Sequence, residues 1–134
     1  DDCLALLDLC LVAEPCLHTV RDLATHVGVH PGTLQSRFLR HGLPPVKRYL
    51  ALGALVRAAI LLDDRRASIS TVSHRLDYSS PQAFGRHVQL QLGLHASAWR
   101  RSYDGEGMFT RFCEELIDPH VARLTSFMPF STPG

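Results

Sequence analysis

The chain has 134 residues, 46% of them hydrophobic, which suits one globular domain whose core needs neither disulfides nor metals. No apolar run approaches the roughly 18 to 20 residues that span a bilayer, and the N-terminus lacks the basic start and cleavage site of a secretory signal. These properties argue against a membrane partner, and we expect a cytoplasmic protein.

The formal net charge of +1 conceals an uneven distribution along the chain. Residues 18–101 contain 12 Lys or Arg against four Asp, a net of +8, whereas residues 1–17 carry −4 and residues 102–134 carry −3. A basic middle between acidic ends is the pattern expected of a surface that binds a polyanion. Charge alone does not separate this interpretation from an ordinary domain with an arginine-rich surface.

Apolar residues recur at helical spacing throughout the chain, and no segment alternates for long enough to form a strand, so we expect an all-α fold. The predicted helices cover residues 3–13, 20–27, 31–40, 45–62, 69–76, 81–92 and 96–102. After residue 104 we expect a short tail, with a helical turn or two at 109–117 and a Pro-rich end.

The first predicted helix, 3–13, is apolar almost all round, with Asp8 as its only charge, so it must be covered on more than one side. It is either fully buried in this domain, or it turns part of its surface toward a second subunit or a domain absent from the chain.

The spacing of cysteines and histidines predicts no metal, cofactor or redox site. No C-x-x-C pair occurs, so the cysteines are interpreted as buried thiols in a reducing compartment; they are Cys3, Cys10, Cys16 and Cys113. His26 and His30 are four residues apart with no third ligand beside them, and we expect them to be solvated histidines on a helix surface.

Local signals indicate where the helices begin and end. Thr19 and Asp22 form a pattern like a capping box at the start of the helix 20–27, and Gly28 can adopt the left-handed turn that follows. Pro31 and Pro81 suit the first position of a helix.

The chain contains two weakly similar copies of one pattern. Corresponding residues of the two copies are 49 positions apart at first, and this distance grows by one position after each of two inserted residues. The corresponding pairs are Val20 and Ile69, Leu23 and Val72, Ala24 and Ser73, Val27 and Leu76, Gly28 and Asp77, Pro31 and Pro81, Leu34 and Phe84, Phe38 and Val88, and Gly42 and Gly93.

Each copy is a short helix, a tight turn and a second helix, which is the pattern of a helix-turn-helix, although a single copy could equally be a plain helical hairpin. The helix between the copies has about 18 residues and a length near 27 Å at a rise of about 1.5 Å. It could hold the second helices of the two copies about one DNA turn apart, roughly 34 Å, on one face of a duplex.

Residues 19–101 resemble the DNA-binding domain of the AraC/XylS family of bacterial transcription regulators. The similarity lies in "LATHVGVHPGTLQSRF", "YLALGALVRAAILL", "ISTVSHRLDYSSPQAF" and "GLHASAWRR", which follow the family's order and spacing. The resemblance implies about seven helices in two subdomains. Its parts are an apolar helix and link at 1–17, a first helix-turn-helix at 18–43, a linker helix at 44–64, and a second helix-turn-helix with a closing helix at 65–103. The tail, 104–134, has no counterpart and no assigned role.

The resemblance also implies that the helices beginning at Pro31 and Pro81, the recognition helices, enter successive major grooves. Base contacts would come from Gly32, Gln35, Ser36, Gln82, Ala83 and Arg86. Phosphate contacts, which position the domain without specifying sequence, would come from Arg37, Arg40, Lys47, Arg48, Arg100 and Arg101. Gln pairs with adenine and Arg with guanine, so Gln35, Gln82 and Arg86 are the strongest candidates for direct readout.

The second copy departs from the family more than the first does. Gly85 lies inside its recognition helix, at a cost of about 0.5 to 1 kcal/mol relative to Ala. We therefore expect the second recognition helix to fold but to contribute less affinity than the first. The other departures are Asp77 in place of Gly, Val88 in place of Phe, Gln89 and Gln91 in place of cations, Ala54 in place of a basic residue, Ser36 in place of Arg and Ala96 in place of Pro.

We expect a sequence-specific transcription regulator, or the DNA-binding domain of one, that binds double-stranded promoter DNA and contacts RNA polymerase or a second subunit. The family commonly has an effector-binding or dimerisation domain before this one. The alternative is a protein-interaction module with decayed DNA binding, using the first helix and the apolar residues of the tail, which are Phe109, Phe112, Leu116, Phe127 and Phe130. Ordinary packing of that tail onto the domain is the competing interpretation.

We expect no enzyme, because no Ser, His and Asp stand at a spacing that builds a nucleophile with its base. The chain also has no Gly-rich phosphate loop, and no catalytic residue is assigned.

Overall fold

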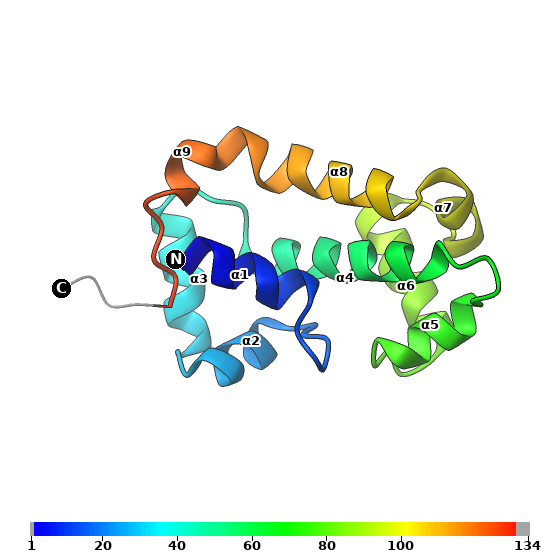
Figure 1. Ribbon diagram of the computed structural model, residues 1–134. Helices are drawn as coiled ribbons and strands as arrows, with labels where there is room; N and C mark the ends of the chain where they lie inside the picture. Colours follow the sequence, from blue (N-terminus) through cyan, green and yellow to red (C-terminus); the bar gives the residue numbers. More distant parts are fainter. Residues whose placement is uncertain (1, 131–134) are drawn as a thin grey trace.

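The computed structural model describes residues 2–130, and within them the chain is helical with no strand (Figure 1). The all-α prediction is confirmed. The elements are α1 (Asp2–Leu11), α2 (Val20–Val27), α3 (Pro31–Arg40), α4 (Val46–Leu62), α5 (Ile69–Arg75), α6 (Pro81–Leu92), α7 (Ala96–Ser102), α8 (Gly105–Leu116), a 3-10 turn η1 (Asp118–His120) and α9 (Val121–Leu124). None of the described helices is long and apolar enough to cross a bilayer.

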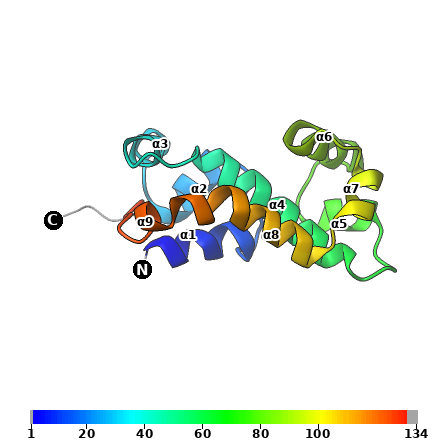
Figure 2. The ribbon, with the colours of Figure 1, turned by 90° about the horizontal axis from the view of Figure 1, so that it is seen from above.

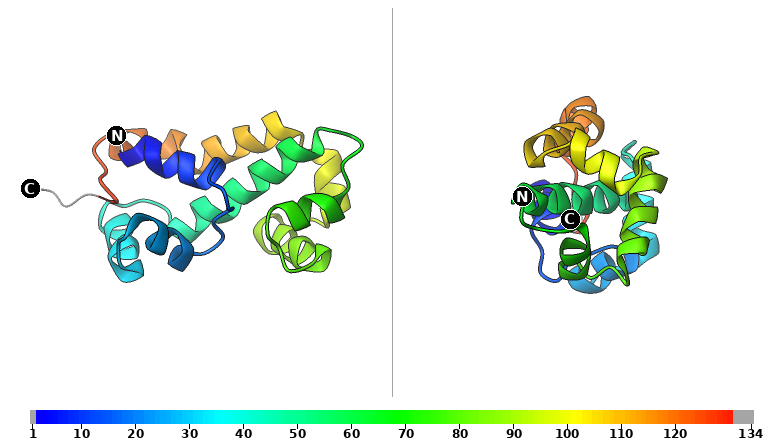
Figure 3. Two further views of the ribbon diagram at one scale, coloured as in Figure 1. Left: turned by 60° about the horizontal axis from the view of Figure 1, so that its bottom comes forward. Right: turned by 90° about the vertical axis from the view of Figure 1, so that its right-hand side faces the viewer.

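The centre of the fold is α4, whose residues from Tyr49 to Ala59 are all buried. The pair α2–α3 packs near the start of α4 and the pair α5–α6 near its end (Figure 3, left). Ala54 is only 1% exposed, so a basic side chain could not be accommodated there without burying its charge.

The two helix pairs share one backbone plan. Leu34 and Phe38 of α3, like Phe84 and Val88 of α6, are at most 1% exposed, so each pair keeps its inward positions. Both pairs are followed by a glycine in the left-handed conformation, and the φ angles of Gly42 and Gly93 are 69° and 70°. Trp99 of α7 is fully buried and completes the second core.

Side-chain caps hold the helix ends in place. Thr19 and Asp22 form the full capping box of α2, with the Asp22 N–H donating to Thr19 Oγ1 at 3.0 Å. Ser80 accepts the N–H of Ala83 at 3.0 Å and so begins α6. His30 is exposed, as expected of a surface histidine, and in addition its Nδ1 accepts the Gly32 N–H at 3.0 Å and caps α3.

The helix α1 lies against α4 at a point where only glycine fits, since a Cβ on Gly53 would stand 2.5 Å from the Cys10 carbonyl oxygen. Leu6 and Cys10 are buried there, whereas Leu4 and Val12 are 62% and 64% exposed. Of the two alternatives that the sequence left open for this helix, full burial within the domain is therefore wrong. Part of its outer surface is exposed in the part of the chain that the structure describes.

The C-terminal segment is more ordered than the sequence predicted. Where we expected a helical turn or two at 109–117, α8 runs for 12 residues antiparallel to α4, from α7 back toward α3 (Figure 1). Met108, Phe112 and Leu116, each one helical turn from the next, form its buried stripe. The last part of the Pro-rich end, 131–134, lies outside the described residues.

Two glycines concealed this helix in the sequence. "DGEG" resembles a turn, but Asp104 caps α8 by accepting the Gly107 N–H at 2.6 Å. Gly105 is required because a Cβ there would stand 2.6 Å from Asp63 Oδ2, where the start of α8 meets the end of α4. Tertiary contact with α4 therefore overrides the low helix propensity of these residues.

Candidate nucleic-acid interface

The helices α3 and α6 lie on the same side of α4, one toward each of its ends (Figure 2). The helix α1 lies on the opposite side, and α8 covers a third side (Figure 3, right). Since α4 has 17 residues, its axis is about 26 Å long at about 1.5 Å per residue. The length of α4 is thus of the same order as one turn of duplex DNA, about 34 Å.

The outer surface of α3 carries the predicted base-contact residues of the first copy. Gln35 and Ser36 are exposed, and Gly32 is half-buried beside the His30 cap. With Leu34 and Phe38 turned into the core, the amide of Gln35 is the group on this surface best able to pair with a base edge.

The outer surface of α6 carries the corresponding residues of the second copy. Gln82 and Arg86 are exposed and Ala83 is half-buried. Arg86 lines an open cleft between the two copies that also includes Asp22 and Asp77. This guanidinium therefore lies in a less cationic neighbourhood than Arg40 of α3 does.

Some of the six predicted phosphate-contact side chains are exposed, and others are engaged, meaning that they are partly buried and hydrogen-bonded within the protein. Arg40, Lys47 and Arg101 are exposed, although Arg40 Nε donates to the Ser36 carbonyl at 3.3 Å. Arg37 and Arg48 are partly buried, and both are bonded to the C-terminal segment.

Arg48 joins three helices. Its Nη2 donates to Glu115 Oε1 of α8 at 2.9 Å, and its Nη1 donates to Gln91 Oε1 of α6 at 2.6 Å. The bond to Arg48 lowers the pKa of Glu115 and raises that of Arg48. Gln91, which replaces a family cation, is therefore an acceptor for Arg48. A phosphate would have to compete with Glu115 for this guanidinium.

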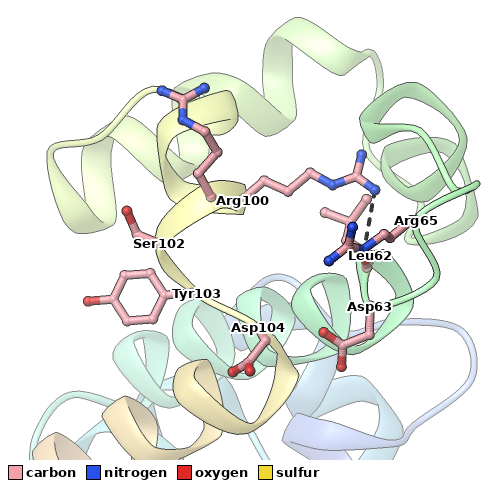
Figure 4. A pocket seen from close by; sticks show the side chains of 8 residues that line it. Leu62, Asp63, Arg65, Arg100, Ser102, Tyr103 and Asp104 are labelled. Carbon is pink, nitrogen blue, oxygen red and sulfur yellow. Dashed lines mark hydrogen bonds between the residues drawn. The ribbon is translucent and has the colours of Figure 1, made fainter.

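Arg37 is held in a similar way, because its Nη1 donates to the Pro129 carbonyl at 2.6 Å. Arg100 extends across an open cleft of about 450 Å³ between α4 and α7, and its Nη2 lies 3.4 Å from the Leu62 carbonyl oxygen (Figure 4). Arg101 is the more exposed of these two adjacent arginines and is the better placed to meet a phosphate.

Sequence reasoning missed a cluster of rings between the two copies. His18 Nε2 lies 2.5 Å from the Leu76 carbonyl oxygen, and the His18 ring meets Tyr78 edge-on at 4.6 Å between centroids. His87 Nε2 lies 3.1 Å from the Ala51 carbonyl oxygen of α4. Burial lowers the pKa of His87, because it disfavours the charged imidazolium. Only the high histidine content hinted at the cluster.

The described residues contain no group of three or more His, Cys, Asp or Glu that could hold a metal ion. Cys10 and Cys16 are buried as expected, whereas Cys3 and Cys113 are partly exposed. Burial raises the pKa of Cys10 to about 12, so this thiol is a packing residue and not a nucleophile.

Two short helices joined by a tight turn, occurring twice on one side of a central helix, define a helix-turn-helix DNA-binding domain. A family model described as a helix-turn-helix domain, of the AraC type, matches residues 23–102. The chain therefore belongs to the AraC/XylS family by its DNA-binding domain, which is a transcription-regulator domain and not an enzyme family. No curated protein and no solved structure matches the chain.

Proposed function

We propose that this chain binds double-stranded promoter DNA in a sequence-specific way, with α3 and α6 in successive major grooves. The observation that carries the proposal is the exposure of Gln35 and Arg86 on two helices that lie on one side of α4. Gln35, Gln82 and Arg86 read base edges, while Gly32, Ser36 and Ala83 allow close approach of the helix backbones.

Phosphate contacts come mainly from Arg40, Lys47 and Arg101, because these cations are exposed. The first turns of α3 and α6 add backbone N–H groups that also attract phosphate. Arg37, Arg48 and Arg100 contribute less, since each is partly buried and donates a hydrogen bond to a residue distant in sequence.

Selection of bound duplexes from a random library tests the proposal. We expect two conserved half-sites separated by about one helical turn, roughly 10 base pairs. Recovery of unrelated sequences, or of a single half-site, would contradict it.

Salt dependence separates the exposed cations from the engaged ones. Each phosphate contact contributes about −0.9 to the slope of log affinity against log salt concentration, so Lys47→Ala should make the slope shallower by about 1. Arg48→Gln should leave the slope nearly unchanged, and an equal change for both variants would show that Arg48 contacts DNA.

The alternative of a protein-interaction module loses much of its proposed surface. Phe112, Leu116 and Phe127 are at most 4% exposed, so they stabilise the fold and are not available to a partner. The exposed side of α1 remains the surface where RNA polymerase, a second subunit or a preceding domain would make contact.

A further inference from the structure

We propose that the C-terminal segment from Gly105 to Phe130, called the brace below, fixes the distance and angle between the two recognition helices. The brace thereby determines which half-site spacing the protein accepts. The inference rests on the proposed function, since it concerns how both helices meet one duplex.

The brace reaches the second recognition helix through buried side chains. Phe84 of α6 lies 5.7 Å from Trp99 of α7, measured between ring centroids. Trp99 Nε1 donates to Met108 Sδ of α8 at 3.5 Å. All three side chains are fully buried, so a shift of α6 relative to α8 would open a void or cause a clash.

The brace reaches the first recognition helix in the same way. Phe112, one turn after Met108, lies 6.3 Å from Tyr49 of α4, whose hydroxyl donates to the Leu116 carbonyl at 2.8 Å. The Tyr49 ring lies 5.7 Å from Phe38 of α3. A continuous row of packed side chains therefore runs from α6 through α8 to α3.

The end of the brace closes on α3 a second time. Phe127 meets Phe38 edge-on at 4.8 Å, and Arg123 Nη1 donates to the Gly42 carbonyl at 2.7 Å. Arg37 of α3 donates to the Pro129 carbonyl at 2.6 Å. The first recognition helix is thus held at Arg37, at its buried Phe38 and at the glycine that follows its end.

Polar bonds add a direct connection between the brace and α6. The Arg48 guanidinium binds Glu115 of α8 and Gln91 of α6 at once. Because this contact joins the last turn of α6 to the last turn of α8, it resists rotation of α6 about α4.

If the two recognition helices are held rigidly, the two half-sites on the DNA must stand at one fixed spacing. One added base pair moves a half-site by about 3.4 Å along the duplex and about 34° around it. A rigid pair of recognition helices cannot follow both changes and loses one set of base contacts. A pair joined by α4 alone could adjust by bending where the copies meet it.

The test measures affinity for duplexes whose half-sites stand at the selected spacing or at one base pair more or fewer. The same proteins are also measured on a duplex with one half-site. We expect wild type to lose about 10- to 100-fold at either altered spacing, as when base contacts are lost. Phe112→Ala should reduce that discrimination to about threefold while binding to a single half-site stays within about twofold.

If Phe112→Ala does not fold, two milder substitutions test whether the brace sets the spacing preference. Tyr49→Phe removes only the hydroxyl bonded to Leu116, and Glu115→Gln removes one charge from the ion pair. Each should lower the discrimination by about two- to threefold, since one hydrogen bond or ion pair is lost. Glu114→Gln, the same change at the exposed neighbouring position, should have no effect.

A second control separates bracing from stability. Leu6→Ala truncates a buried residue of α1, outside the row of side chains, and should lower the melting temperature without changing the spacing preference. Failure of wild type to recognise two half-sites would refute the proposed function. Two results would refute the brace while leaving the proposed function intact. The first is two-site binding whose spacing discrimination is unchanged in every folded brace variant. The second is an equal change of that discrimination in Glu114→Gln or Leu6→Ala.

Discussion

The two helix-turn-helix copies adopt the same backbone plan with different residues at the same positions. The turn between the helices uses Gly28 in the first copy, with φ of 71°, and Asp77 in the second, with φ of 64°. The second core is sealed by Val88 where the first has Phe38, and both are at most 1% exposed. Equivalent conformation therefore does not require equivalent side chains, but it leaves strain in the second copy.

The same comparison at Arg37 and His87 shows how each recognition helix is supported. Arg37 of α3 is bonded to the carbonyl of Pro129, and His87 of α6 to that of Ala51 on α4. Both positions connect the recognition helix to the body of the domain. At this position the first copy is bonded to the C-terminal segment, whereas the second is bonded to α4.

The two copies should differ most in the stability that is lost when their equivalent core residues, Phe38 and Val88, are truncated. Phe38→Ala removes a ring that contacts Tyr49 and Phe127, and it should lower the free energy of unfolding by about 3 to 5 kcal/mol. Val88→Ala should cost about 2 kcal/mol, because it deletes fewer buried atoms. Urea unfolding measures both, and equal losses would show that the first core does not depend on the C-terminal segment.

Substitutions of base-contact residues should show which recognition helix contributes more to the affinity for DNA. Gln35→Ala should weaken binding to the selected duplex by about 1 to 3 kcal/mol, and Arg86→Ala by less within that range. Gln89→Ala, at an exposed position on the later turns of α6, serves as the control. Fluorescence anisotropy at one fixed salt concentration gives the values. A larger loss for Arg86→Ala would reverse the expected order.

Asp77→Gly should make the second turn resemble the first. A left-handed φ is strained for a residue with a Cβ, so glycine should raise the free energy of unfolding by about 1 kcal/mol. Asp77→Ala removes the same charge but keeps the Cβ, and it should give no gain. If both variants stabilise the protein equally, the charge and not the φ angle is responsible.

Gly85→Ala should strengthen α6 by a smaller amount. A Cβ at Gly85 would have nothing within 4 Å, so alanine should add about 0.5 to 1 kcal/mol of stability without a clash. Thermal unfolding measures the gain. Loss of DNA affinity in this more stable variant would indicate that the duplex approaches the backbone closely at Gly85.

The smallest effect concerns pH and applies to the second copy alone. Burial lowers the pKa of His87 below its ordinary value of 6.5, so the unfolded chain takes up a proton more readily than the folded one. Stability should therefore fall as pH drops below 6.5, and His87→Gln should reduce that fall. Urea unfolding across this pH range provides the measurement, and an unchanged slope in the variant would contradict the assignment.

Much of the fold follows from local signals. Thr19, Ser80 and Gly93 mark helix ends through caps that act within four residues, and the structure begins or ends its helices at those places. The outward positions of Gln35 and Gln82 follow from helical periodicity once Leu34 and Phe84 are turned inward.

What the sequence did not predict depends on contacts between distant segments. Pro129 is 92 residues from Arg37, and Glu115 is 67 residues from Arg48, so no local pattern indicates that these arginines are engaged. The helix α8 was missed for the same reason, because Gly105 is favoured by the approach of Ile60 and Asp63 at the end of α4.

The position of α1 and α8 on sides of α4 that carry no recognition helix also affects how the protein would approach DNA. The helices α1 and α8 carry five acidic residues against one arginine, whereas α3 and α6 carry three arginines and no acidic residue. The charges of these four helices therefore form a dipole whose positive end is at the recognition helices. In the field of a duplex this dipole would turn the domain so that its recognition helices lead, and productive encounters would become more frequent at low salt than the net charge alone would allow.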